Sequence, residues 1–239
     1  MILANLVKAV REQNYYAVFL EFAIVILGVV IGFQITAWNA QREDNARAAA
    51  LLDRLEAEIT DVLAEREGAL EYFEARQRIL AGFNAVLTPG SEEEGSDALC
   101  NAIDDSHIYI WGAVRIPVLE EIRDTGDIRL LTNARARNAL VALDISNNTS
   151  RDRAATIRSV ESIIRLQFPD LLTVLPFTEG EIEDNEWPLS CDWQGMRENP
   201  AVFNAISNNY DRLGALLNLR QRENEALRAA LDALADARS

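Results

Sequence analysis

One histidine, two cysteines and an isolated glutamate are the residues of this sequence whose type and position could support chemistry. His107 is the only histidine and follows Asp104 by three residues in the segment DDSHIYIW. On a helix, that spacing would place an imidazole beside a carboxylate. A metal site needs three or four ligands, and a hydrolytic triad needs a nucleophile, for which no nucleophile-elbow motif is present. We therefore expect a capping or surface histidine, with no metal and no cofactor.

Motifs that mark common enzymes and nucleic-acid binders are missing from the sequence. It contains no G-x-G-x-x-G, Walker A or H-E-x-x-H pattern. The net charge is −15, and because the two basic and two acidic residues of the first forty cancel, the whole −15 belongs to residues 41–239. So acidic a region repels phosphate backbones. We predict a protein that is not an enzyme and does not bind nucleic acid.

The apolar stretch from residue 15 to residue 38 has the length and composition of a membrane span. Only three residues between Ala17 and Ala37 are polar, and about 20 apolar residues cross a bilayer as a helix. Aromatic rings favour the membrane interfaces, and this stretch has such anchors at both ends: Tyr15, Tyr16 and Trp38. We predict a transmembrane helix over 15–38, spanning roughly 35 Å at about 1.5 Å per residue.

A cleaved signal peptide is the alternative for this stretch. Cleavage after Ala37 or Ala40 would place Ile35 or Trp38 at the −3 position, where small residues are required. We therefore expect a retained span.

The distribution of basic residues predicts the orientation of the span. Lys8 and Arg11 precede it, whereas the basic residues that follow are mixed with acids, so the positive-inside tendency favours a cytoplasmic N-terminus. We expect a protein of the bacterial inner membrane. Residues 1–14 would form a short cytoplasmic amphipathic segment, and residues 39–239 a periplasmic helical domain.

One stripe of the predicted span carries its glutamate and both its glycines. At about 100° per residue, five residues share this stripe: Glu21, Val25, Gly28, Gly32 and Ile35. A Gly-x-x-x-Gly face permits close approach of another helix, and a carboxyl at membrane depth is costly unless it is neutral, paired or near the interface. We predict a helix–helix interface in which Glu21 bonds across to another membrane subunit or to a second copy. Glu21 reaching the headgroups, or serving a proton or ion pathway, are the alternatives.

The region beyond the span is predicted to be an all-α bundle. Apolar residues recur at helical spacing in the 45 residues after Trp38, so the span is expected to continue into a long amphipathic helix. A heptad pattern fills the C-terminal end, interrupted by Arg220 and Asn224, which either fix a register or mark a frayed seam. We expect these two helices to pack as a hairpin, with self-association as the alternative. Further helices are predicted over 97–111, 117–124 and from Asn133 towards residue 168, followed by an irregular segment rich in proline.

The two cysteines, Cys100 and Cys191, stand in different parts of this outer region. In an oxidising compartment such a pair most often forms a disulfide. A bridge closing a loop of about ninety residues would stabilise the fold by roughly 4 kcal/mol in the chain-entropy model. We predict the disulfide; two buried thiols are the alternative.

Two blocks of the sequence resemble a group of small bacterial membrane proteins defined by a domain of unknown function. The first is FLEFAIVILGVVIGFQITAWN, residues 19–39, with its E…GxxxG…WN signature. The second is VLEEIRDTGDIRLLTNARARNAL, residues 118–140, with Gly126 and Asn133 at the matching positions. The resemblance implies a single N-terminal span and a helical fold, and it implies no activity.

These features favour a non-catalytic role. We expect an accessory or scaffolding subunit that joins a larger membrane assembly through its span. A periplasmic ligand-binding or sensing module that signals through a partner protein is the second hypothesis, because helical bundles of this size can hold small ligands.

Overall fold

The computed structural model describes residues 15–108, 114–159, 162–177 and 187–238. They are mostly helical, with two strands of three residues each, which confirms the predicted all-α fold. The chain divides into two compact units, Met1–Asp53 and Arg54–Ser239. This division falls within a helix and not at residue 38, where the sequence places the end of the span. The predicted cytoplasmic segment, residues 1–14, lies outside the described residues.

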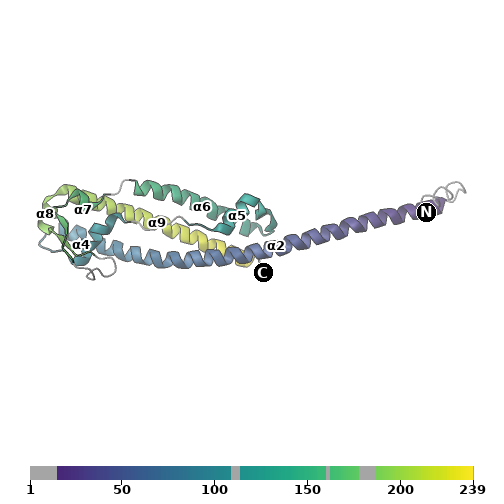
Figure 1. The fold of residues 1–239 in the computed structure, drawn as a ribbon, viewed down its shortest axis with the longest axis horizontal. Helices are drawn as coiled ribbons and strands as arrows, with labels where there is room; N and C mark the ends of the chain where they lie inside the picture. The colour runs from purple at the N-terminus through teal and green to yellow at the C-terminus, as the bar shows by residue number, and fades with distance from the viewer. Residues whose placement is uncertain (1–14, 109–113, 160–161, 178–186, 239) are drawn as a thin grey trace. The chain divides into compact units, whose positions relative to one another are not determined.

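The described part of the first unit is the beginning of helix α2, which runs from Tyr15 to Leu80 (Figure 1). It is long and apolar enough to cross a membrane. No residue in its most apolar window is buried. In Figure 1 this purple part of the chain is one continuous helical ribbon. Its large apolar side chains are exposed, as expected of a helix whose surroundings are lipid.

Two long helices form the frame of the second unit, together with the part of α2 that follows Asp53. Helix α6 covers Ala134–Arg158 and helix α9 covers Pro200–Asp236. They lie side by side in Figure 1 and pack closely against each other.

The predicted packing of the two end helices is present, because Phe73 and Leu80 of α2 belong to one buried cluster with Leu213 and Leu217 of α9. Helix α6 packs against α9 as a third long helix. Ion pairs of Arg66 with Glu223 and of Glu67 with Arg228 also join α2 to α9.

The beginning of α6 follows from local sequence. Asn133 is its N-cap, and the Asn133 Oδ1 atom accepts hydrogen bonds from the backbone N–H groups of Arg135 (2.8 Å) and Ala136 (3.1 Å). Such a cap satisfies donors that have no partner within the first turn of a helix. The predicted start at Asn133 is confirmed.

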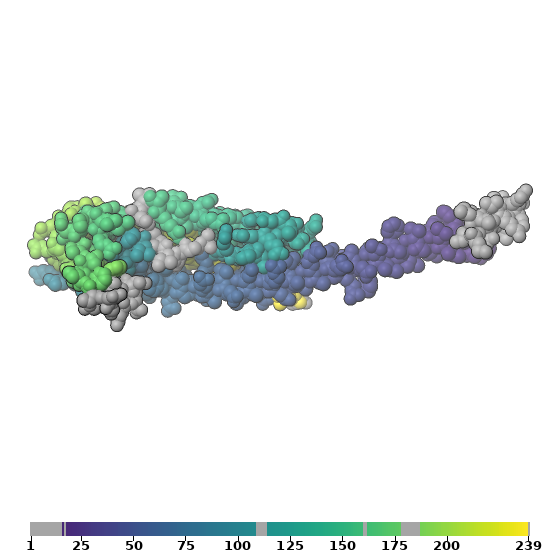
Figure 2. Space-filling view, in the orientation of Figure 1, coloured from purple at the N-terminus to yellow at the C-terminus, as the bar shows by residue number. Residues whose placement is uncertain are grey.

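Helix α5, Pro117–Thr125, ends as the sequence predicts. Gly126 follows it with φ of 74°, a left-handed conformation that glycine adopts without steric cost, and a short 3-10 helix, η2 (Asp127–Leu130), comes next. A residue far away in sequence completes the other end of α5, because the Glu58 carboxylate accepts a hydrogen bond from the Val118 N–H at 2.9 Å. In Figure 2, α5 and α6 form one edge of this unit.

Short elements fill the end of the second unit where α2 stops. These are α3 (Phe83–Leu87), α4 (Asp97–Asp104), η1 (Asp105–His107), α7 (Ile164–Gln167), β1 (Leu172–Val174), β2 (Leu189–Cys191) and α8 (Trp193–Glu198). The strands β1 and β2 pair antiparallel, with Leu172 opposite Cys191. Here the apolar core joins α2, α4 and α9, with Phe83 near the rings of Phe203 and Tyr210.

Two predicted helices are shorter than expected. The helix predicted over 97–111 ends at Asp104, passes through η1 and is extended at Ile108, with φ of −86° and ψ of 111°; residues 109–113 lie outside the described residues. The helix predicted to run from Asn133 towards Phe168 ends at Arg158. In both segments β-branched residues follow the break, and these favour extended backbone.

Candidate membrane-helix interface and buried polar clusters

The predicted interface stripe of the span is open. A Cβ atom added to Gly28 or Gly32 would meet nothing within 4 Å outside the local helix backbone. Val25 and Ile35, which lie on the same stripe, are 54% and 55% exposed. We call these four residues and Glu21 the glycine stripe. Within the part of the chain that the structure describes, no segment covers the glycines of this stripe.

Glu21 differs from its neighbours on the stripe because it is half-buried. Its Oε2 atom is shielded from solvent and accepts no hydrogen bond from the described residues. At the other end of the stripe the Thr36 hydroxyl donates to the Gly32 carbonyl oxygen at 3.0 Å, a bond that satisfies a hydroxyl inside a helix without a partner outside it. Glu21 is thus the polar group of the stripe that calls for an external partner.

The predicted interface anchors are placed at the two ends of the apolar stretch. Tyr15 is the first residue of α2, and the Tyr16 and Trp38 side chains are exposed. The Arg42 guanidinium lies 4.9 Å from the centre of the Trp38 ring, within the range of a cation–π contact. An aromatic ring paired with a cation one turn further on suits the polar boundary of a bilayer.

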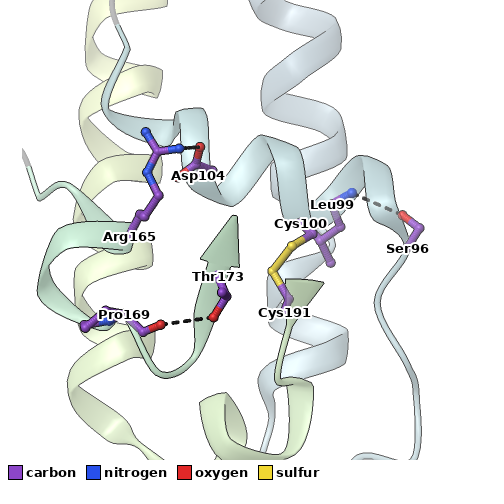
Figure 3. The surroundings of a disulfide bond; sticks show 8 residues. All are labelled: Ser96, Leu99, Cys100, Asp104, Arg165, Pro169, Thr173 and Cys191. Carbon is purple, nitrogen blue, oxygen red and sulfur yellow. Dashed lines mark hydrogen bonds and ion pairs between the residues drawn. A yellow bond between two sulfur atoms is a disulfide. The ribbon is translucent and has the colours of Figure 1, made fainter. Parts of the chain in front are cut away.

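The two cysteines form a disulfide that joins α4 to β2, with Cα atoms 5.9 Å apart (Figure 3). One turn further along α4, Asp104 is buried and its Oδ2 atom lies 3.3 Å from the Arg165 Nη1 atom on α7. A covalent bond and an ion pair therefore connect the same helix to the segment that carries α7, β1 and β2. The pairing of Cys100 with Cys191 is the one that the sequence predicts.

Asp104 and His107 do not form the carboxylate–imidazole pair that their spacing suggests. The Nδ1 atom of His107 lies 2.8 Å from the Asp104 backbone carbonyl oxygen, which makes the histidine a cap of the α4–η1 turn. Burial raises the pKa of the Asp104 carboxyl above its ordinary value, and the charges of Arg165, His107 and Arg76 offset only part of that effect. No group of three or more metal-ligating side chains occurs among the described residues.

A second buried cluster lies where α2 and α9 meet. The Oε2 atom of Glu223 accepts hydrogen bonds from the Nη1 atoms of Arg66 and Arg220, each at 2.6 Å. The Glu223 side chain is 2% exposed and that of Arg220 is 4% exposed. Burial lowers the pKa of Arg66 and the Glu223 charge partly opposes this. Both guanidinium groups therefore contact the same oxygen of Glu223.

Helix α6 adds neutral polar groups at the same level of the bundle. The antiparallel register of α6 and α9 is fixed at one end by the ion pair of Arg135 with Asp236 and at the other by contacts near residue 157. This register brings Asn147 to the level of Asn224, and both side chains are buried. The interruption at Arg220 and Asn224 is therefore a buried polar layer and not a frayed seam.

In the sequence, Arg220 and Asn224 stand out as an interruption of the heptad pattern. The other members of the buried polar clusters were not predicted. Arg66 occupies a position of the apolar stripe of α2, between Leu63 and Leu70, where helical spacing expects another apolar residue. That irregularity was the available signal. Glu223 gave no comparable signal, because its burial depends on α2 and α6 together.

A groove of about 250 Å³ opens between α2 and α9. Its lining is mainly polar: Glu74, Gln77, Arg78, Gly214, Leu217, Asn218 and Gln221. Small-molecule sites are usually enclosed and apolar with a few polar groups, so this groove has little in common with one.

The chain matches no protein-family model, no curated protein and no solved structure. The resemblance to a group of small bacterial membrane proteins therefore stays a prediction, and the function is argued from the residues alone.

Proposed function

We propose that this protein is a non-catalytic accessory or scaffolding subunit of a membrane protein assembly. In this proposal, the apolar beginning of α2 spans the bacterial inner membrane with the N-terminus in the cytoplasm. The glycine stripe binds a helix of another subunit, and residues 39–239 form a helical domain in the periplasm. The bilayer and the neighbouring subunit are its partners.

The observation that carries the proposal is the open surface at Gly28 and Gly32, where no described atom occupies the space of an added Cβ. Small residues at such spacing let helix backbones approach closely within a bilayer, where helices associate through packing and hydrogen bonds. The disulfide and the buried ion pairs support a rigid outer domain, which suits a scaffold. Among the described residues the sensing hypothesis has less support, because the groove between α2 and α9 is mainly polar.

The test is co-purification of the full-length protein from native membranes in mild detergent, with bound proteins identified by mass spectrometry. The double variant Gly28→Leu/Gly32→Leu fills the space that the partner would occupy, so we expect it to lose its partners by tenfold or more. That loss corresponds to about 1.4 kcal/mol.

A matched control places added bulk on the opposite face of the same helix. Val30→Leu/Ala37→Leu lies about 180° from the glycine stripe, and both positions are exposed. We expect this control to retain the partners. If the glycine variant keeps every partner, or if both variants lose them equally, the proposed interface is wrong.

A further inference from the structure

We infer that the helix bound by the glycine stripe belongs to a different protein and presents a basic side chain to Glu21. This inference rests on the proposed function and specifies the chemistry of the partner. It follows from the burial of the Glu21 carboxyl, from the residues of the span and from the charge of the whole chain.

The Glu21 carboxyl needs a hydrogen-bond donor. Glu21 Oε2 is shielded from solvent and receives no hydrogen bond from the described residues. An ionised carboxylate is only an acceptor of hydrogen bonds, so it needs a donor from outside. Within a bilayer an unpaired charge is costly, and intramembrane carboxylates generally pair with a cation or another polar group. A lysine or arginine on the bound helix would meet this requirement.

The identical span of a second copy does not supply that cation. From Tyr15 to Trp38 the chain contains no lysine, arginine or histidine. A parallel pair of identical spans would therefore place Glu21 beside Glu21 at the same depth, where two ionised carboxylates would repel each other. Self-association would also bring together two outer regions that each carry a net charge of −15. A basic partner relieves both repulsions.

The position of Glu21 along the helix sets the expected depth of the partner's basic residue. Glu21 is five residues beyond Tyr16, or about 7.5 Å along the helix, and Gly28 is about 10 Å further. The partner is thus expected to have its basic residue near the membrane boundary on the N-terminal side. About two to three turns deeper it must have a surface that can pack against glycine.

A charge-exchange experiment tests this inference on the full-length protein. Glu21→Gln keeps the shape of the side chain and removes its charge, and we expect it to reduce co-purification of the identified partner about tenfold. Glu43→Gln is the control, because it removes one exposed negative charge outside the apolar stretch, and we expect it to retain the partner. In Glu21→Arg, binding should be lost and then restored when the partner's basic residue is changed to glutamate.

The outcomes separate this inference from the proposed function. If Gly28→Leu/Gly32→Leu loses the partner but Glu21→Gln keeps it, the interface stands and the basic residue is wrong. The inference is also overturned if the partner's span has no basic residue or if only the protein itself is recovered. Restoration of Glu21→Arg by Lys8→Glu or Arg11→Glu within the same chain would likewise overturn it. If the glycine variant loses nothing, the proposed function itself fails.

Discussion

The Asp104 carboxyl is buried and has little contact with water. Its side chain is 3% exposed, its Oδ1 atom has no hydrogen-bond partner among the described residues, and Arg165 lies 3.3 Å from Oδ2. The free-energy cost of removing a carboxylate from water exceeds the attraction that one partly exposed guanidinium provides. Burial consequently raises the pKa of Asp104 above its ordinary value of 3.8.

This raised pKa predicts a specific pH dependence of stability. Between pH 3.8 and the raised value, the folded protein binds more protons at Asp104 than the unfolded chain does, so this residue's contribution to stability falls as pH rises. Asp104→Asn removes that contribution. We expect the unfolding free energy of the variant, relative to the wild type, to increase from about pH 4 upwards and then to level off.

The measurement is denaturant unfolding of both full-length proteins in detergent across this pH range. Asp170→Asn is the control, because Asp170 is exposed and should show no such trend. A difference that is flat with pH, or that favours the wild type at higher pH, would contradict the explanation from burial.

At the scale of helices, α2 and α9 are joined by ion pairs of two kinds. Glu223 binds Arg66 inside the bundle, whereas Arg228 pairs with Glu67 on the surface with about half of each side chain exposed. Exposed pairs contribute about 0–1 kcal/mol, because water screens them. Loss of one partner from a buried pair is far more costly, because the remaining charge stays buried.

We therefore expect Glu223→Ala to lower the free energy of unfolding by about 3 kcal/mol or more. Arg228→Ala, which removes an exposed pair between the same two helices, should change it by less than about 1 kcal/mol. Chemical denaturation monitored by circular dichroism compares the two variants. Equal effects would mean that the buried cluster is not an important link between α2 and α9.

The boundaries of these helices show what local sequence determines. Asn133 and Gly126 act through bonds and backbone angles within a few residues, so their roles follow from the sequence. The strands β1 and β2 are three residues each and are separated by proline-containing chain, and their register pairs Leu172 with Cys191. Such long-range pairing leaves no periodic pattern, which explains why the sequence predicted an irregular segment there.

For the whole molecule, the same distinction applies to the candidate sites. The glycine stripe is a property of one helix, and its five residues follow from periodicity alone. The cluster of Arg66, Arg220 and Glu223 requires two helices that are far apart in the chain, with α6 closing the level beside them, and no single segment predicts it. The uneven charge is visible from the sequence at once, and it is this charge that argues against pairing of two identical chains.

Site-specific photocrosslinking in intact membranes tests the glycine stripe most directly. A photoreactive amino acid is placed singly at Val25 and Ile35, which border the glycines, and at Val30 and Ala37 on the opposite face. We predict crosslinks to a defined membrane protein from Val25 and Ile35, and none from the other two positions. Crosslinks of equal strength around the helix, or none from the stripe, would contradict the proposal that this face binds another membrane helix.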